Sequence, residues 1–261
     1  MSKKNKHRCT QRKVNDIQAI DDDLYIDNDC HMELRGEENK LRLKINEFKW
    51  TPKQVEFIKL ALNEDTRAIF INGPAGTSKT LLAVYTGLRL LNSGNVSEIM
   101  YIRSAVESSD SRLGYLPGSA DEKLQFYNLP FLDKLIELLS HEQTAKLEKD
   151  KRVNMFPVNF SRGLNWNNKC VIFDEAQNSS IKEITTVLTR IGKQSRCFIL
   201  ADPMQTDIHK GGAFEAMFKL FGDDDSKKNG VYTFEFTEED IMRSALVKFL
   251  VTKLKQLKVK A

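Results

Sequence analysis

The stretch FINGPAGTSKTLLAVYTGL, from Phe70 to Leu88, decides the fold. A short apolar run ends at a turn with two glycines, and the segment after the turn repeats apolar side chains at helical spacing. Such a turn points backbone N–H groups at an anion, and a following lysine and threonine add a cation and a hydroxyl. Lys79 and Thr80 fit the pattern GxxxxGK[ST], but Ser78 replaces its second glycine. The stretch therefore predicts a strand, a phosphate-binding loop and a helix, with one departure.

The departure at Ser78 costs little if the backbone there is already close to helical, since serine is favoured at helix N-termini. We therefore predict that the loop binds phosphate. The alternative is a glycine turn with a structural role only. The predicted phosphate-binding residues are Gly73, Pro74, Ala75, Gly76, Thr77, Ser78, Lys79 and Thr80.

Apolar runs of strand length alternate with amphipathic segments along the rest of the chain. This alternation predicts an α/β fold with a mainly parallel sheet covered by helices on both faces. In residues 180–191 the expected buried side is Ile181, Ile184, Leu188 and Ile191. The expected strands are residues 68–72, 98–102, 169–173, 197–201 and 231–236, and the expected helices are 51–62, 79–91, 130–139, 180–191 and 239–257.

The 261 residues allow one large domain, which we place at residues 46–261 behind a charged N-terminal arm at residues 1–45. The arm either stays free or contacts nucleic acid or a partner, and the alternation of Leu41, Leu43 and Ile45 could add a short strand. Because the chain has neither a signal peptide nor an apolar run of about 18 residues, we expect a cytoplasmic protein without a membrane partner.

The four cysteines form no CxxC pair. Cys170 and Cys197 lie at the start of apolar runs and are expected in the core of a protein from a reducing compartment. An alternative use of cysteine is a zinc site in the arm, whose ligands would be His7, Cys9, Cys30 and His31.

A second motif, CVIFDEAQNSS, ends an apolar run with Asp174 and Glu175. A carboxylate at this point can hold Mg²⁺ with Thr80, and a second carboxylate can polarise an attacking water. Ligands in parallel sheets bind beyond the carboxyl ends of the strands, where both motifs lie. The pair therefore indicates an enzyme that hydrolyses nucleotides. Glu175 distinguishes it from switch-type GTPases and small-molecule kinases, which need no glutamate at this place.

The run FILADPMQTD supplies a third polar group. Gln205 can sense the γ-phosphate or orient water, whereas Asp202 can instead cap the following turn. Gln54, ahead of the loop, either hydrogen-bonds an adenine edge or is a surface residue.

Five ordered motifs resemble those of the PhoH family, phosphate-starvation-inducible P-loop ATPases frequent in bacteria and their phages. The resemblance covers about residues 51–257, with Ser78 and Ala201 departing from the family's glycines. If the chain is phage-encoded, the cytoplasm is that of the host. The motifs are GPAGTSKT, SAVESSDSRLGYLPGSADEK, VIFDEAQNSSIKEITTVLTRIG, ADPMQTDI and EEDIMRSALVKFL.

The resemblance implies a RecA-like P-loop NTPase with a three-layer αβα core, ATP and Mg²⁺, related to superfamily-one helicases. By the same likeness Lys79 and Thr80 bind phosphate and Mg²⁺, and Gln205 senses the γ-phosphate. Arg243 resembles a late helicase arginine that contacts the γ-phosphate, and Arg190 is a second candidate. Structural ion pairing is the alternative for each arginine.

The same likeness implies RNA or single-stranded DNA as partners and a homo-oligomer, for which a hexameric ring is one arrangement. Arg103 and Ser104 follow a strand as strand-contacting helicase residues do, and Phe160, Arg162 and Trp166 could contact backbone and bases. A ring-lining or packing role is the alternative for these residues. Two functions remain open: a nucleic-acid-stimulated ATPase, or an ATP-gated assembly or binding protein with little turnover.

Overall fold

The computed structural model describes residues 41–104, 120–158, 165–205 and 213–242, together with 246, 248–250 and 252–253; of residues 120–127 it describes the helical backbone only. The chain divides into two compact units, residues 1–33 and 34–261, and the described residues all belong to the second unit. The candidate zinc ligands of the arm therefore lie outside the described residues.

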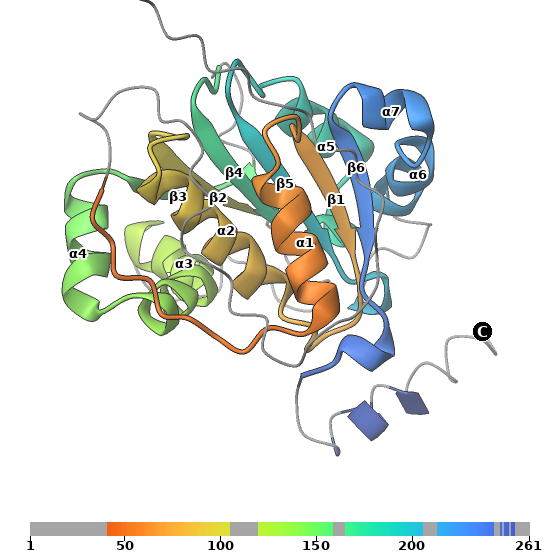
Figure 1. Cartoon of the computed structure of the whole chain (residues 1–261), viewed down its shortest axis with the longest axis horizontal. Coiled ribbons are helices and arrows are strands. Elements are labelled where there is room, and N and C mark those ends of the chain that lie inside the picture. Colours follow the sequence, from red (N-terminus) through yellow and green to blue (C-terminus); the bar gives the residue numbers. More distant parts are fainter. Residues whose placement is uncertain are drawn as a thin grey trace, which may run out of the picture. The chain divides into compact units, whose positions relative to one another are not determined.

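One parallel sheet forms the centre of this unit (Figure 1). Its strand order is β3-β2-β4-β5-β1-β6, and every neighbouring pair is parallel. Strand β5 therefore lies between β1, which leads into the glycine turn, and β4, which ends in the acidic pair. The strands are β1 (Ala68–Asn72), β2 (Glu98–Arg103), β3 (Val153–Pro157), β4 (Lys169–Asp174), β5 (Arg196–Ala201) and β6 (Val231–Glu235).

Helices cover both faces of the sheet, which gives the three layers of the predicted αβα fold. The α-helices are α1 (Pro52–Leu62), α2 (Lys79–Asn92), α3 (Ala120–Leu138), α4 (His141–Lys149), α5 (Ile181–Leu188), α6 (Ala213–Leu220) and α7 (Asp224–Lys228). Short 3-10 turns are η4 (Ala176–Asn178), η5 (Pro203–Gln205) and η6 (Glu238–Asp240). Within the described residues, no helix is long and apolar enough to cross a membrane.

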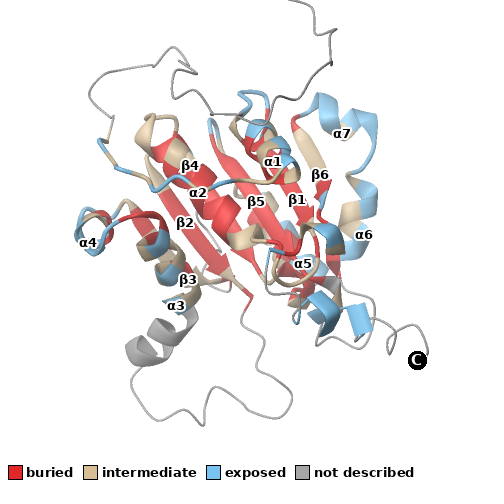
Figure 2. Ribbon diagram, turned by 60° about the horizontal axis from the view of Figure 1, so that its bottom comes forward, coloured by how far each residue is buried: buried red, intermediate tan, exposed pale blue. Residues whose placement is uncertain are grey.

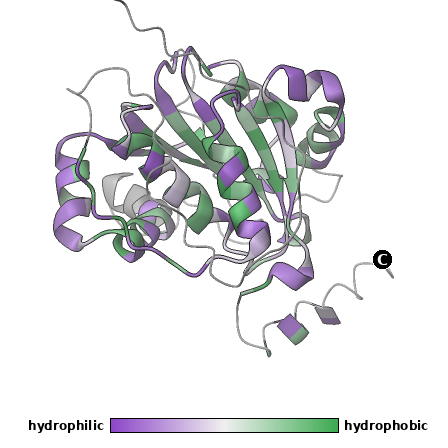
Figure 3. Ribbon diagram, in the orientation of Figure 1, coloured by the Kyte–Doolittle hydropathy of each residue, from purple (hydrophilic) through white to green (hydrophobic). Residues whose placement is uncertain are grey.

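Two apolar cores lie on opposite faces of the sheet. One contains Phe57 of α1, Leu82 of α2 and Phe131 of α3, and the other contains Ile184 of α5 and Phe214 of α6. Alternate strand residues contribute to the two cores, so the central strands are buried along almost their whole length (Figure 2) and consist mostly of hydrophobic residues (Figure 3). This double burial explains why the strands read as continuous apolar runs rather than as alternating patterns.

The structure confirms the α/β class and the parallel sheet, but it contains an additional strand. Strand β3 has the sequence VNMFP, pairs with β2 at the edge of the sheet, and buries only its first residue fully. An edge strand that is half-buried lacks the continuous apolar run by which the central strands were recognised.

The buried side predicted for residues 180–191 is partly wrong. Ile181 is 61% exposed because it is the first residue of an eight-residue helix, whose core-facing side chains are Ile184, Val187 and the half-buried Leu188. Ile191 lies beyond the end of this helix and pairs with Trp166 in an isolated parallel bridge. The predicted helix at residues 180–191 is too long, because α5 ends at Leu188.

The alternation at Leu41, Leu43 and Ile45 is present, but no strand forms there. These side chains are half-buried against the core, and the Leu43 backbone N–H donates to Asn92 Oδ1 at 2.8 Å. A side-chain amide thus takes the place of a neighbouring strand. The domain boundary between residues 45 and 46 stays a prediction.

The described part of the C-terminal helix is residues 246, 248–250 and 252–253. Its described apolar side chains are exposed: Leu246, Phe249 and Leu250.

Candidate functional site

The glycine turn lies at the carboxyl edge of the sheet, between β1 and the N-terminus of α2. Gly76 has a φ of 89°, and Ser78 has a φ of 63° and a ψ of 24°, which is the left-handed region. The expectation of a near-helical Ser78 is therefore wrong. Its side chain also makes no capping hydrogen bond to α2. Ser78 adopts the conformation for which the common pattern uses glycine, and it pays the steric cost of a Cβ there.

Gly73 is required for a different reason. A Cβ at this position would meet Phe236 Cβ at 2.8 Å and the Phe236 carbonyl oxygen at 3.2 Å. The segment after β6 thus runs directly over the turn, where Phe236 N–H donates to Asn72 O at 2.8 Å and Met242 N–H donates to Gly76 O at 3.0 Å. The turn is held from outside by a segment some 160 residues later in the sequence.

Lys79, the first residue of α2, folds its side chain back into the turn. Its Nζ donates to Gly73 O at 2.6 Å and to Pro74 O at 2.9 Å. Burial lowers the pKa of Lys79, and the charges of Asp202 and the acidic pair act in the opposite direction. The ammonium group is therefore held at the N-terminus of a fourteen-residue helix, whose first N–H groups have no acceptor within the helix. A cation and oriented N–H groups together suit a phosphate.

Thr80 and Asp174 meet as the sequence predicts. Thr80 Oγ1 donates to Asp174 Oδ2 at 3.1 Å, across 94 residues of sequence. Tyr101 OH donates to the same Oδ2 at 2.8 Å, and Glu175 N–H donates to Oδ1 at 3.0 Å. A hydroxyl beside an anchored carboxylate provides the hard oxygen donors that Mg²⁺ prefers, and this pair could hold such an ion with substrate phosphates. Sequence reasoning missed Tyr101 because nothing in EIMYIR marks it as more than a core residue.

Glu175 follows β4 in a left-handed conformation, with a φ of 55° and a ψ of 34°. Its Oε2 accepts from Gln177 Nε2 at 2.6 Å, and its Oε1 lies 3.7 Å from Arg103 Nη2. Burial and the charge of Asp174 raise the pKa of Glu175, while the Gln177 hydrogen bond and the cations Arg103 and Lys79 lower it. A carboxylate with a raised pKa is a better proton acceptor when ionised, as a general base needs to be.

Asp202 has the capping role that was the alternative for it. Its Oδ1 accepts from Met204 N–H at 3.0 Å, and its Oδ2 accepts from Gln205 Nε2 at 2.8 Å. Gln177 Oε1 accepts from Asp202 N–H at 3.1 Å, so Gln177 connects the ends of β4 and β5. The cap holds the Gln205 amide in the pocket that Lys79 and the acidic pair also line.

These groups line one pocket of about 350 Å³, within the range of about 300–1,000 Å³ typical of ligand pockets. Its described lining includes four carboxylates and two ammonium groups, so a polyphosphate would meet net repulsion unless a divalent cation accompanied it. The charged lining residues are Glu137, Asp174, Glu175, Asp202, Lys79 and Lys134. Lys134 and Glu137 come from α3 and were missed, because an ion pair on a helix surface carries no sequence signal of a site.

Other predicted residues are placed elsewhere. Gln54 is buried in the capping box of α1, where its Oε1 accepts from Thr51 N–H at 3.0 Å, so the surface alternative is wrong. Its contact with adenine stays a prediction. Arg190 follows α5 and its carbonyl accepts from Trp166 N–H at 2.9 Å; it is not among the residues that line the pocket. Arg243 lies outside the described residues.

The residues predicted to contact nucleic acid lie in different surroundings, and their contact with nucleic acid stays a prediction. Trp166 is only 2% exposed and packs in the core, as its alternative role required. Arg103 faces Glu175, and Ser104 Oγ donates to Asn178 O at 3.2 Å. Phe160 and Arg162 lie outside the described residues.

Comparison with known proteins shows which family this chain belongs to. Residues 48–255 match the family described as PhoH-like protein. A PhoH-like protein of Bacillus subtilis (strain 168) is 34% identical over 200 residues, which cover 76% of this chain and 60% of that relative. Protein PhoH of Escherichia coli (strain K12) is 31% identical over 198 residues, which cover 74% of this chain and 54% of that relative. The matches thus span between half and two thirds of the length of these relatives.

Among solved structures, the crystal structure of Pif1 helicase from Candida albicans covers 73% of this chain and 41% of its own, with a TM-score of 0.35 and 13% identity. The parallel sheet with helices on both faces, and the glycine turn between β1 and α2, give this chain the three-layer α/β fold that was predicted.

Proposed function

The chain belongs to the PhoH-like protein family, and on this premise we propose that it is a Mg²⁺-dependent ATPase. The observation that carries the proposal is the hydrogen bond between Thr80 and Asp174, with Lys79 and Glu175 lining the same pocket. These four residues supply the groups that hydrolysis of a nucleoside triphosphate requires: a phosphate-binding cation, two ligands for a metal ion and a general base.

Each residue has a role that follows from its contacts. Lys79 exchanges its bonds to the loop carbonyls for bonds to phosphate oxygens, because an ammonium group donates more strongly to an anion than to a neutral carbonyl. The hydroxyl proton of Thr80 is committed to Asp174, which leaves the oxygen lone pairs of Thr80 for a cation. Bound Mg²⁺ would neutralise phosphate charge. Glu175 accepts the proton of the attacking water.

Further roles complete the proposal. Gln205 senses the γ-phosphate from the turn that Asp202 caps. Arg243 contacts the transferred phosphoryl group, and the bond from Met242 N–H to the phosphate-binding turn supports this choice over Arg190. Gln54 would bind the adenine edge through Nε2, because its Oε1 already accepts from Thr51 N–H in the capping box. ATP as the nucleotide comes from the family resemblance.

We further propose that the protein acts on RNA or single-stranded DNA as a homo-oligomer. The support for such an assembly is the family resemblance, and a hexameric ring is one arrangement that would provide it. Arg103 supports a link between bound nucleic acid and the proposed base, because it lies at the end of β2 with its Nη2 3.7 Å from Glu175 Oε1.

The test is steady-state ATP hydrolysis with and without single-stranded RNA, at low and moderate salt because phosphate contacts are salt-sensitive. Glu175→Gln is expected to lower kcat by about 10²–10⁴-fold, the usual contribution of a general base, while nucleotide still binds. Lys79→Ala is expected to abolish binding. Glu215→Gln and Lys219→Ala change the same residue types at exposed positions of α6 and serve as controls.

Three outcomes separate the functions. RNA-stimulated turnover that is lost in Glu175→Gln supports a nucleic-acid ATPase. Nucleotide binding without turnover under any condition refutes the ATPase and leaves an ATP-gated assembly or binding protein. Turnover that is equal in wild type and Glu175→Gln refutes the assignment of the base.

A further inference from the structure

Asp174 is held by a residue that lies behind the pocket rather than in it. Its Oδ2 accepts two hydrogen bonds, from Thr80 on the loop side and from Tyr101 on the sheet side. Tyr101 lies in the middle of β2, opposite Ile172 of β4 in the register, and is not among the lining residues. The phenol therefore reaches the carboxylate from the neighbouring strand, two residues along from its partner.

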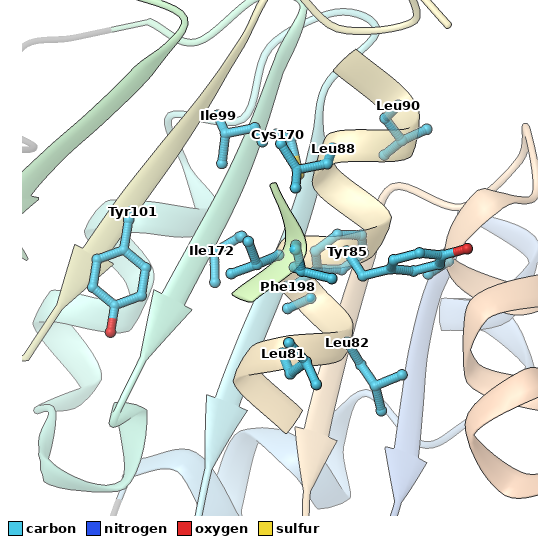
Figure 4. Packing of buried hydrophobic residues seen from close by; sticks show 14 of the residues in the cluster. Leu81, Leu82, Tyr85, Leu88, Leu90, Ile99, Tyr101, Cys170, Ile172 and Phe198 are labelled. Carbon is cyan, nitrogen blue, oxygen red and sulfur yellow. The ribbon is translucent and has the colours of Figure 1, made fainter. Parts of the chain in front are cut away.

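The ring of Tyr101 is fixed on all sides. The residue is 1% exposed and stacks on Phe131 of α3, with ring centroids 4.7 Å apart and an angle of 11° between the planes. Figure 4 shows its hydroxyl directed toward the carboxyl ends of the strands, whereas the hydroxyl of Tyr85 points sideways and bonds Glu47 and Arg89. A buried ring with one available direction for its hydroxyl is a rigid support.

The hydrogen bonds leave Asp174 little freedom. Glu175 N–H occupies one lone pair of Oδ1, and Thr80 and Tyr101 occupy two lone pairs of Oδ2. An ionised carboxylate can only accept, so Tyr101 must be the donor. If the phenol is removed, Oδ2 keeps only the donor from Thr80, which is itself the predicted metal ligand.

We propose that Tyr101 is a positioning residue for the metal site, which fixes the Asp174 carboxylate so that the carboxylate and the Thr80 hydroxyl bind Mg²⁺ together. This inference rests on the proposed function. Tyr101 acts on the metal through Asp174 and touches neither nucleotide nor water. Groups that orient metal ligands in this way typically contribute about 10–100-fold to metal affinity.

The test is a Mg²⁺ titration of the binding of a fluorescent ATP analogue, with a parallel measurement in EDTA. Tyr101→Phe keeps the ring and its stacking and removes only the hydroxyl. We expect it to raise the Mg²⁺ concentration at half-saturation by about 10–100-fold and to leave binding in EDTA unchanged. Tyr85→Phe is the matched control, since it removes another buried phenol, which bonds Glu47 and Arg89 away from the pocket.

A second comparison isolates the route through Asp174. In an Asp174→Asn background, Tyr101→Phe should produce no further shift, because the carboxylate that it positions is absent. Thermal unfolding of every variant measures whether its stability has changed. If the role of Tyr101 were purely structural, Tyr101→Phe would lower the stability and leave the Mg²⁺ midpoint unchanged.

The outcomes distinguish this inference from the proposed function. A Mg²⁺ midpoint of Tyr101→Phe within twofold of wild type overturns the inference alone, as does an equal shift in the Asp174→Asn background. Failure of wild type to bind nucleotide with or without Mg²⁺ overturns the proposed function and the inference with it.

Discussion

Replacing Ser78 with glycine should stabilise the protein without reshaping its phosphate-binding turn. Ser78 has a φ of 63° and a ψ of 24°, and its side chain forms no capping hydrogen bond to α2. The serine side chain therefore imposes the steric cost of a left-handed backbone and makes no capping contact in return. Glycine adopts the same angles without that cost.

Two opposing effects set the magnitude. A left-handed conformation costs an L-residue roughly 1–2 kcal/mol, which glycine would recover. Glycine loses roughly 0.5–1 kcal/mol more conformational entropy on folding. The difference predicts an increase of about 0–1.5 kcal/mol in the free energy of unfolding, and its middle value of about 0.75 kcal/mol corresponds to about 1.5–3 °C in Tm for a domain of this size.

Calorimetry of wild type and Ser78→Gly measures the shift. The control is Ser93→Gly at the other end of α2, where φ is −80° and the hydroxyl donates to Leu90 O at 3.1 Å. This change should lower Tm, because it removes a hydrogen bond and adds chain entropy to the unfolded state. A lower Tm for Ser78→Gly, or equal shifts at both sites, would refute the reasoning.

The same variant bears on turnover. Serine already holds the backbone angles that glycine would take, so kcat should change by less than the tenfold that about 1.4 kcal/mol represents. A large gain in turnover would instead favour the binding protein that hydrolyses little ATP in its natural form.

Two further perturbations test the surroundings of the turn and of the base. Gly73→Ala places a Cβ 2.8 Å from Phe236 Cβ and should lower the free energy of unfolding by about 1–3 kcal/mol in denaturant titrations, whereas Gly222→Ala, whose added Cβ meets nothing closer than 3.5 Å, should be tolerated. Arg103→Met removes a cation that lowers the pKa of Glu175, so the acid limb of the pH–kcat profile should move to higher pH. A limb that stays in place or moves to lower pH would contradict the second prediction.

The sequence alone established the class of fold because central parallel strands are buried on both faces. That burial requires continuous apolar runs, and such runs are visible without a structure, as in CVIF and CFILA. The half-buried edge strand β3 escaped detection for the same reason, since one exposed face breaks the run.

The sequence also placed the polar residues of the site, because the carboxyl ends of parallel strands share one edge of the sheet. Lys79, Thr80, Asp174, Glu175 and Gln205 follow strands or the turn, and the pocket brings all five together.

Only the tertiary structure decided how these residues are supported. The left-handed backbone at Ser78, the phenol behind Asp174 and the segment that covers Gly73 depend on backbone angles and on contacts between distant strands. Local sequence patterns report the spacing of residues along one helix or strand. The contacts of Tyr101 and Phe236 instead join residues 73 or more positions apart, and tyrosine and phenylalanine are ordinary core residues. The chain thus encodes its site residues locally, and the geometry that orders them arises when the strands pair.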